Sequence, residues 1–460
     1  MKRILFLIVS CSLFLTSCAS TQDIVPADYK LPEFKEIQLD NGLRILFLED
    51  PEIPFLSLGL SIPKGYIYDP VGKSGLSQIA VAMLRKGTKQ RNATQIAEDL
   101  DYLGLDFSSA IDLELSTFSI NGLSKFEGEI LNNYKEMIFE PAFAKDEVTR
   151  IKKQVVAGLK KIGDDPSSLA DLYSKEFLFG NHPMARIGAG KIRDVQSIDP
   201  KDVKEQYKKL LTPKDAVLTV VGRYSSDFQQ KIIKEFSAWK AEEPTAPVLP
   251  SIEPAKHLQI RLHTKESLKQ TQVRFVDLGP KRDIKDYLAI RIANTILGGN
   301  FAARLMQEVR VKRGLTYGIY SGFDHNLENG SFQIRSFTRN DKVGELVTST
   351  LNVFKEFVEN GLTEEELRKG KNVLLSNYPN AIETKAKLAG NLAGLRFYGI
   401  SDDYLYDFVD NVESISLSEV NKAIKKYMHP DHLKILVLGP SKVRDQLKDV
   451  GILEVRASRM

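Results

Sequence analysis

The strongest constraint on the fold is an internal repeat. Residues 195–222, "VQSIDPKDVKEQYKKLLTPKDAVLTVVG", align without a gap with residues 412–439, "VESISLSEVNKAIKKYMHPDHLKILVLG", at an offset of 217 positions. Each copy predicts a capped helix, a proline turn and a β-branched strand that ends at glycine. The identical pairs are Val195/Val412, Ser197/Ser414, Ile198/Ile415, Val203/Val420, Lys208/Lys425, Lys209/Lys426, Pro213/Pro430 and Gly222/Gly439. The repeat therefore predicts two homologous domains of about 210 residues, each large enough for its own core.

A proline-rich stretch separates the two copies. Residues 241–256, "AEEPTAPVLPSIEPAK", hold four prolines and no apolar periodicity, which predicts a linker. We therefore expect an N-terminal domain over residues 34–240 and a C-terminal domain over residues 257–450.

The order of elements within each domain predicts an α+β fold. Two alternating runs around Asp40-Asn41-Gly42 indicate a β-hairpin, and residues 105–122 indicate a second strand pair. Helices are expected near residues 93–104, and Thr363 and Glu366 have the spacing of a capping box before a later helix. We expect an antiparallel sheet in each domain, with helices packed on one face.

The first residues predict an exported lipoprotein. Residues 1–18 give a basic start, an apolar run and small residues, which is typical of a signal peptide rather than a membrane span. Leu15-Thr16-Ser17-Cys18 is similar to the bacterial lipobox, which predicts that Cys18 is lipidated. A plain signal peptide with a chance cysteine is the alternative. Residues 19–33 would form a flexible tether.

Lipidation of Cys18 would limit the cysteine chemistry open to the mature chain and would place the chain at a membrane. The only other cysteine, Cys11, would leave with the signal, which excludes disulfides and cysteine metal sites. Removing Lys2 and Arg3 lowers the formal charge from +4 to 4 − 2 = +2, which argues against nucleic acid as a partner. Because Ala19 is not the aspartate that can retain lipoproteins at the inner membrane, we expect an outer-membrane anchor facing the periplasm.

Residues 72–88, "GKSGLSQIAVAMLRKGT", predict a short amphipathic helix and carry a family resemblance. The stretch resembles the helix of pitrilysin/insulinase-type zinc peptidases, a family that includes the mitochondrial processing peptidase subunits. The matching residues are Gly75, Leu76, Met83, Leu84, Gly87 and Thr88. The resemblance covers residues 30–450 and implies the same two-domain α+β fold.

In that family this helix carries H-x-x-E-H, whose histidines bind zinc and whose glutamate activates water. Here Gln78 and Ala82 replace the two histidines, and Val81 replaces the glutamate. Gly158 stands where the resemblance places the remaining glutamate ligand. These side chains cannot bind zinc, so we expect no metal, no cofactor and no catalysis from this chain alone.

The remaining histidines offer no substitute site. Only His429 and His432, in "HPDH", are closely spaced, and the repeat partner "TPKD" has no histidine, so a turn before a strand is expected there. His182, in "FGNHPMA", resembles a structural loop of the family.

The C-terminal domain departs less from the family pattern. Residues 296–323, "ILGGNFAARLMQEVRVKRGLTYGIYSGF", resemble a motif whose arginine and tyrosine reach the substrate near the zinc of another domain. Arg310 and Tyr317 have that spacing, and residues 315–323 indicate a strand. The family role implied for Tyr317 is hydrogen bonding to the oxyanion, and for Arg310 it is fixing a substrate carbonyl. A solvated helix position for Arg310 and simple packing for Tyr317 are the alternatives.

Loss of the zinc-site residues alongside an intact Arg/Tyr motif resembles one half of a split peptidase. We expect the non-catalytic subunit of a heterodimeric zinc metallopeptidase, which binds peptides and completes a zinc site carried by an H-x-x-E-H paralogue. The alternative is a catalytically inert, lipid-anchored peptide-binding or scaffold protein.

Overall fold

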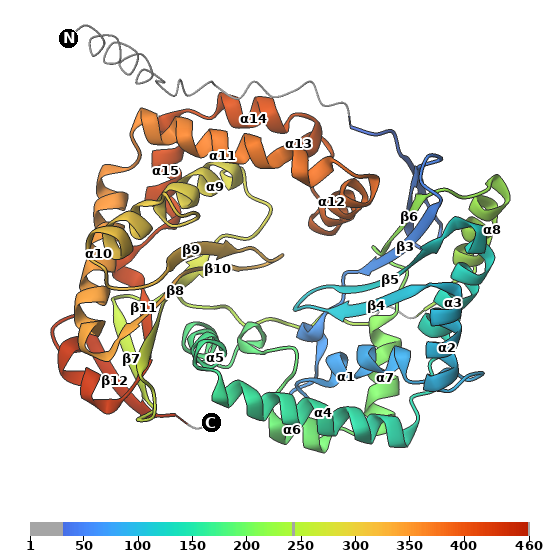
Figure 1. The fold of residues 1–460 in the computed structure, drawn as a ribbon, viewed down its shortest axis with the longest axis horizontal. Helices are drawn as coiled ribbons and strands as arrows, with labels where there is room; N and C mark the ends of the chain where they lie inside the picture. The colour runs from blue at the N-terminus through green and yellow to red at the C-terminus, as the bar shows by residue number, and fades with distance from the viewer. Residues whose placement is uncertain (1–30, 242–243, 459–460) are drawn as a thin grey trace, which may run out of the picture.

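The computed structural model describes residues 31–241 and 244–458. The chain forms two halves, and the blue-to-green half faces the yellow-to-red half (Figure 1). The predicted signal peptide, Cys18 and most of the predicted tether lie outside the described residues. Within the described ranges, no helix is both long and apolar enough to cross a bilayer.

The N-terminal half has one six-stranded sheet in the order β1-β2-β6-β3-β5-β4. Its strands are β1 (Lys35–Gln38), β2 (Arg44–Glu49), β3 (Phe55–Ile62), β4 (Asp106–Ile111), β5 (Ser116–Leu123) and β6 (Val217–Gly222). Its helices are α1 (Leu76–Ala82), α2 (Ala93–Leu103), α3 (Glu127–Phe139), α4 (Lys145–Asp164), α5 (Pro166–Phe179), α6 (Ile192–Ser197), α7 (Pro200–Leu210) and α8 (Ser226–Ser237).

The C-terminal half has a second six-stranded sheet in the order β12-β7-β11-β8-β10-β9. Its strands are β7 (Gln259–Thr264), β8 (Gln270–Gly279), β9 (Ile319–Asp324), β10 (Gly330–Arg339), β11 (Lys434–Gly439) and β12 (Ile452–Ala457). Its helices are α9 (Tyr287–Leu297), the π-helix Met306–Lys312, α10 (Val343–Asn360), α11 (Glu364–Ile382), α12 (Lys385–Tyr398), α13 (Asp403–Tyr406), α14 (Phe408–Ser414) and α15 (Leu417–Tyr427).

The sequence repeat is reproduced residue for residue. Helices α7 and α15 start and end 217 positions apart, and so do strands β6 and β11. Both helices begin with a capping box, formed by Asp199 and Asp202 in α7 and by Ser416 and Glu419 in α15. The hairpin around Gly42 and the capping box of Thr363 and Glu366 are also confirmed.

The predicted α+β class is confirmed, but the sheets are mixed rather than wholly antiparallel. Strand β6 lies parallel to β2 and antiparallel to β3, and β11 lies parallel to β7 and antiparallel to β8. The reason is topological: the strand that ends each repeat lies between two strands that come earlier in the sequence. The outer strand differs between the sheets: β1 is antiparallel to β2, whereas β12, from the other end of the chain, is parallel to β7.

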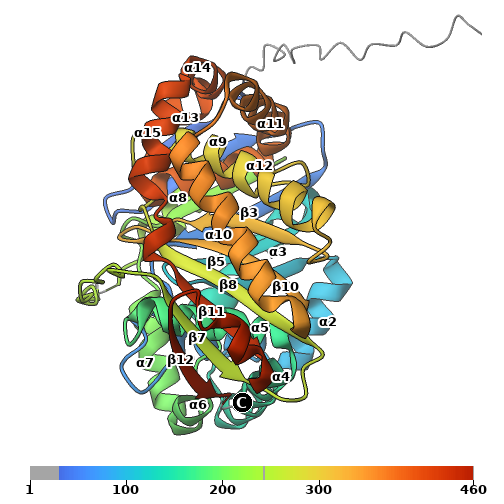
Figure 2. The ribbon, with the colours of Figure 1, turned by 90° about the vertical axis from the view of Figure 1, so that its left-hand side faces the viewer.

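Each half also places one helix on the sheet of the other half, so helices are not confined to one face. Helix α5 of the N-terminal half packs on β8 and β11, and helix α12 of the C-terminal half packs on β6 and β2 (Figure 1). Figure 2 shows α5 beside β8 and β11 from a second direction. Buried Arg274 of β8 donates to Asp171 of α5 at 2.5 Å. This exchange joins the two halves.

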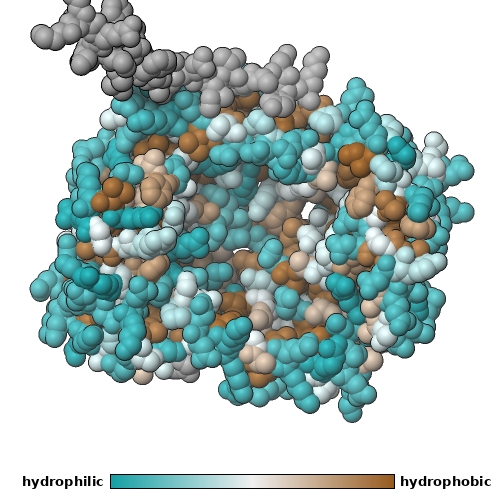
Figure 3. All heavy atoms as spheres, viewed as in Figure 1, coloured by the Kyte–Doolittle hydropathy of each residue, from teal (hydrophilic) through white to brown (hydrophobic). Residues whose placement is uncertain are grey.

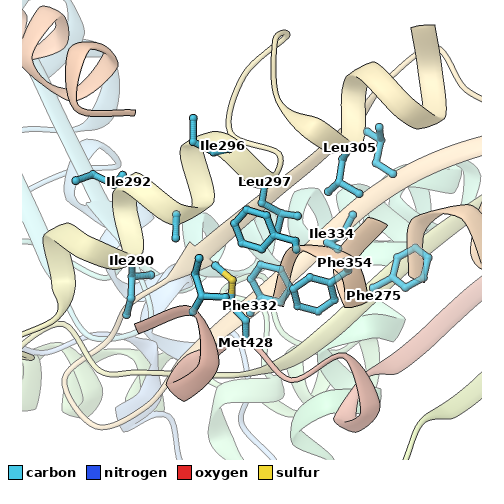
Figure 4. Packing of buried hydrophobic residues seen from close by; sticks show 14 of the residues in the cluster. Phe275, Ile290, Ile292, Ile296, Leu297, Leu305, Phe332, Ile334, Phe354 and Met428 are labelled. Carbon is cyan, nitrogen blue, oxygen red and sulfur yellow. The ribbon is translucent and has the colours of Figure 1, made fainter. Parts of the chain in front are cut away.

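The C-terminal core is built on stacked aromatic rings. Phe332 of β10 lies with its ring centroid 4.8 Å from that of Phe323 and 5.3 Å from that of Phe354 on α10. Figure 4 shows Phe332 and Phe354 packed below α9, with Leu305 among the same buried side chains. This core anchors the segment that follows α9, where the Arg/Tyr motif lies.

Arg396 attaches α12 to the N-terminal half. Its guanidinium donates to Glu36 of β1 at 2.6 Å and to Asp402 at 2.5 Å, and its side chain is 14% exposed. The Arg396 guanidinium, with Arg44 beside it, holds the pKa of the Glu36 carboxyl below its usual value.

Arg396→Met should lower the free energy of unfolding by about 2 kcal/mol at pH 7, because it removes charged hydrogen bonds. Glu36 has a lowered pKa in the folded state, so its contribution is present above its unfolded pKa of 4.5 and is lost as the pH falls. The difference between wild type and Arg396→Met in urea unfolding should therefore shrink below about pH 4. Arg150→Met, which removes an exposed pair with Glu147, is the control and should change stability much less. A difference that stays constant between pH 7 and pH 3 would contradict this account.

Candidate functional site

The first part of the candidate site is helix α1, which is held at its N-terminus by a buried carboxylate. Asp69 accepts hydrogen bonds from the backbone N–H groups of Gly75 and Ser77, both at 2.8 Å, and from the Ser77 hydroxyl at 2.5 Å. Burial raises the pKa of the Asp69 carboxyl, and the Ser77 and Gly75 hydrogen bonds offset part of that rise. Gly75 has φ +97°, and a Cβ there would lie 2.7 Å from the Ala189 carbonyl oxygen. Glycine is therefore required at the start of this helix.

Asp69→Ala should lower the free energy of unfolding by about 2 kcal/mol or more, because it leaves buried donors at the start of α1 without their acceptor. Urea unfolding followed by circular dichroism measures the loss. Asp101→Ala on exposed α2 is the matched control and should have little effect. Equal stability of the two variants would show that Asp69 does not hold α1.

The structure places the three former zinc-helix positions on α1. Gln78 and Ala82 are half-buried one turn apart, and Val81 is 2% exposed in the core. The Gln78 Oε1 atom lies 3.2 Å from the position that a Cβ on Gly188 would take. Gly158 lies exposed on α4, which packs against α1, with open space where a side chain would begin.

The residues at these four positions do not fit zinc. An amide, an isopropyl group, a methyl group and a hydrogen provide none of the imidazole or carboxylate ligands that zinc requires. No group of three or more His, Cys, Asp or Glu side chains in residues 31–241 and 244–458 is arranged to hold a metal ion. The side chains at these four positions therefore offer no zinc ligand.

The second part of the candidate site follows α9. Helix α9 ends at Leu297 and is capped by Gly298, where a Cβ would lie 2.5 Å from the Ser321 hydroxyl, so the glycine lets strand β9 approach closely. Ser321 N–H donates to the Gly298 carbonyl at 3.0 Å. The close approach at Gly298 is therefore made by the chain's own strand β9.

The structure brings Arg310 and Tyr317 together. Arg310 lies in the π-helix, and its Cζ is 4.9 Å from the centroid of the Tyr317 ring. Tyr317 is 78% exposed and Arg310 is half-buried. Both side chains are thus open to a molecule in solution. π-Helical turns are rare and are frequent at functional sites.

The strand predicted over residues 315–323 begins later, at Ile319, so Tyr317 is not on the sheet. The reason is a local turn, in which the Thr316 hydroxyl accepts from the Gly318 N–H at 3.1 Å and donates to the Gly318 carbonyl at 3.0 Å. The Ser336 hydroxyl also donates to that carbonyl, at 3.0 Å, and fixes the turn against β10. Tyr317 is therefore held on a short, ordered turn that projects from the sheet edge.

The histidines lie where structural roles were expected. His182 Nδ1 accepts from the Met184 N–H at 3.1 Å, and burial lowers the pKa of His182. The "HPDH" stretch forms a 3₁₀ turn directly before β11, as predicted. His429 contacts the buried Asp277 at 3.3 Å and stacks on His432. The hydrogen bond that His429 donates to the Asp277 carboxylate raises the pKa of His429.

A cavity of about 600 Å³ between the halves was not predicted. Glu114, at the tip of the β4–β5 hairpin, accepts from the Leu327 N–H in the β9–β10 loop at 3.0 Å. Burial raises the pKa of the Glu114 carboxyl. The Arg282 guanidinium lies 3.5 Å from the ring centroid of Tyr287 on the wall of the cavity. Figure 3 shows the surface hollowed between the halves. No sequence signal joins residues 213 positions apart, so this contact could not be found from the sequence.

Two family models match successive parts of the chain, and the second begins within the N-terminal half. Residues 44–187 match the family model described as insulinase (peptidase family M16), and residues 197–374 match the one described as peptidase M16 inactive domain. A Helicobacter pylori protein named non-peptidase homolog YmxG is 26% identical over 410 residues, covering 86% of this chain and 92% of that protein. A Bacillus subtilis protein named uncharacterized zinc protease YmxG is 23% identical, covering 88% of this chain and 98% of that protein.

Solved structures agree with these matches. The crystal structure of a peptidase M16 inactive domain from Pseudomonas fluorescens is 30% identical, with a TM-score of 0.82, and covers 89% of this chain and 98% of that chain. A Helicobacter pylori protease has a TM-score of 0.81 at 18% identity, which shows a shared fold. With both family models matched and a 30% identical solved structure covering most of its length, the chain belongs to the M16 (insulinase) peptidase family.

Proposed function

We propose that this chain is the non-catalytic subunit of a two-chain zinc metallopeptidase. The zinc would be held by the H-x-x-E-H helix of a paralogous partner, and this chain would bind peptide and supply Arg310 and Tyr317 to the partner's site. The observation that carries the proposal is a contrast. The residues at the zinc-site positions have no side chains that bind zinc, whereas Arg310 and Tyr317 lie side by side with side-chain surface open to solvent.

The chemistry of the two side chains fits that role. During hydrolysis the scissile carbonyl oxygen becomes an oxyanion, and the Tyr317 hydroxyl can donate a hydrogen bond to it. The planar Arg310 guanidinium can donate to a neighbouring peptide carbonyl and fix the strand of substrate. The partner's zinc would supply the activated water. Neither Arg310 nor Tyr317 needs to touch the metal.

The proposal includes a location in the cell envelope. Lipidation of Cys18 would anchor the complex to the outer membrane, facing the periplasm, with the residues before β1 as the tether. This part rests on the sequence around Cys18, which lies outside the described residues.

The test is mass spectrometry of the proteins that co-purify with this chain from gently solubilised native envelopes. A stoichiometric H-x-x-E-H paralogue that carries zinc is the expected result. Recovery of this chain alone, as a homodimer that binds peptides without cleaving them, would overturn the two-chain proposal. That result would favour an inert peptide-binding or scaffold protein instead.

A further inference from the structure

Two aromatic rings, not one, lie within cation–π distance of Arg310. Its Cζ is 4.6 Å from the ring centroid of Phe301 and 4.9 Å from that of Tyr317. Both distances are within the roughly 6 Å at which an aromatic ring attracts a cation electrostatically. Attraction to two rings restricts the rotation of the guanidinium. Phe301 is 56% exposed, so its ring faces solvent as well as Arg310.

The position of Phe301 is fixed by the polypeptide around it. The Asn300 side-chain amide donates to the Thr295 carbonyl at 3.0 Å and its oxygen accepts from the Ala302 N–H at 2.8 Å. The Gln307 side chain donates to the Phe301 carbonyl at 3.0 Å. The turn that carries the ring is therefore tied both to the end of α9 and to the π-helix.

No carboxylate among the described residues pairs with Arg310. The nearest acid on its own segment, Glu308, is engaged with Lys312 at 2.9 Å and with Arg313 at 3.1 Å. Below Arg310, the buried Met306 offers only its sulfur, 3.9 Å from a guanidinium nitrogen. Because that sulfur is its one side-chain hydrogen-bond partner among the described residues, the guanidinium keeps further N–H groups available for an oxygen acceptor.

We infer that Phe301 is a positioning residue for Arg310. Its ring holds the guanidinium against Tyr317, so that the arginine edge and the tyrosine hydroxyl are presented together to the peptide at the partner's zinc site. This inference rests on the proposed function of Arg310 and adds a residue that neither the sequence motif nor the family resemblance assigns.

The test uses the full chain in its two-chain complex and four variants. Phe301→Leu removes the ring but keeps an apolar side chain, and Phe301→Tyr keeps the ring. Val311→Ala changes another exposed apolar residue of the same segment, outside the stack. Arg310→Ala reports whether the arginine matters at all.

Two measurements distinguish the positioning of Arg310 by Phe301 from the role of Arg310 in hydrolysis. Kinetics should give about a fivefold lower kcat for Phe301→Leu with KM little changed, full rescue in Phe301→Tyr and no change in Val311→Ala. Nuclear magnetic resonance of arginine-labelled chain should show the Arg310 Nε–H resonance shielded by the rings and moved in Phe301→Leu only.

The outcomes are distinguishable. An unmoved Arg310 resonance in Phe301→Leu would overturn the positioning role whatever the kinetics. An unchanged kcat in Phe301→Leu, where Arg310→Ala lowers kcat, would overturn it as well. If Arg310→Ala itself leaves kcat unchanged, the proposed function fails, and a moved resonance would still support the stack.

Discussion

Arg310→Ala and Tyr317→Phe should each lower kcat of the two-chain complex about 100-fold, while its zinc content stays the same. Tyr317→Phe removes a hydrogen-bond donor aimed at charge that develops only in the transition state, and loss of one such donor costs about 10²- to 10³-fold. Arg310→Ala removes the donor that fixes the neighbouring peptide carbonyl, and a substrate misplaced by about 1 Å can cost about 10²-fold in rate. Neither side chain lies in the core, so the free energy of unfolding should change little: Tyr317 is 78% exposed and Arg310 is half-buried. Steady-state kinetics on a fluorogenic peptide, with metal analysis of the same samples, gives the measurement.

Matched controls lie close at hand. Arg313→Ala removes an exposed arginine from the same segment, and Tyr406→Phe removes a hydroxyl from an exposed tyrosine on α13. Both should leave kcat unchanged. If the Arg310 and Tyr317 variants behave like these controls, the two residues are remnants of the motif and the trans-acting role is wrong.

Restoring the zinc ligands is the second large expected effect. The triple variant Gln78→His, Ala82→His, Gly158→Glu should bind zinc with a dissociation constant below about 1 µM, whereas the wild-type chain should not bind it. Gln78 and Ala82 lie one turn apart on α1, the spacing that lets two imidazoles share a metal. A side chain at position 158 meets open space on the neighbouring helix. Cobalt substitution gives a visible spectrum that reports tetrahedral coordination.

The single variant Gln78→His is the control for zinc restoration and should bind metal far more weakly than the triple variant, because one imidazole makes one bond. Asp69 continues to hold the start of α1 in every variant, so the helix should stay in register. Failure of a correctly folded triple variant to bind zinc would show that the α1 and α4 backbones no longer present the site. The loss would then be structural as well as chemical.

Local signals predicted the elements of the fold. The capping box at Thr363, the glycine turn at Gly42 and the repeat over α7 and α15 each follow from contacts between residues near in sequence. The exchange of α5 and α12 between the halves could not be predicted. Nothing in the apolar pattern of either helix says whether the sheet that it covers belongs to the same half. Only the folded chain shows Arg274 reaching Asp171 across the halves.

Part of the candidate site could likewise be predicted from the sequence, and part of it could not. The positions of Gln78, Val81 and Ala82 on α1 followed from the residues around them. The family resemblance implied a joint role for Arg310 and Tyr317, but it did not point to the ring of Phe301. A π-helical turn changes which side chains face the same direction, and no periodicity of 3.6 residues predicts that geometry.

The most direct test of the central claim is the peptidase activity of this chain, of its H-x-x-E-H partner, and of the two mixed at equal concentration, with zinc measured in each. The account predicts activity in the mixture alone and one zinc per pair of chains, all of it held by the partner. Equal activity of the partner without this chain, or zinc-dependent hydrolysis by this chain alone, would contradict it.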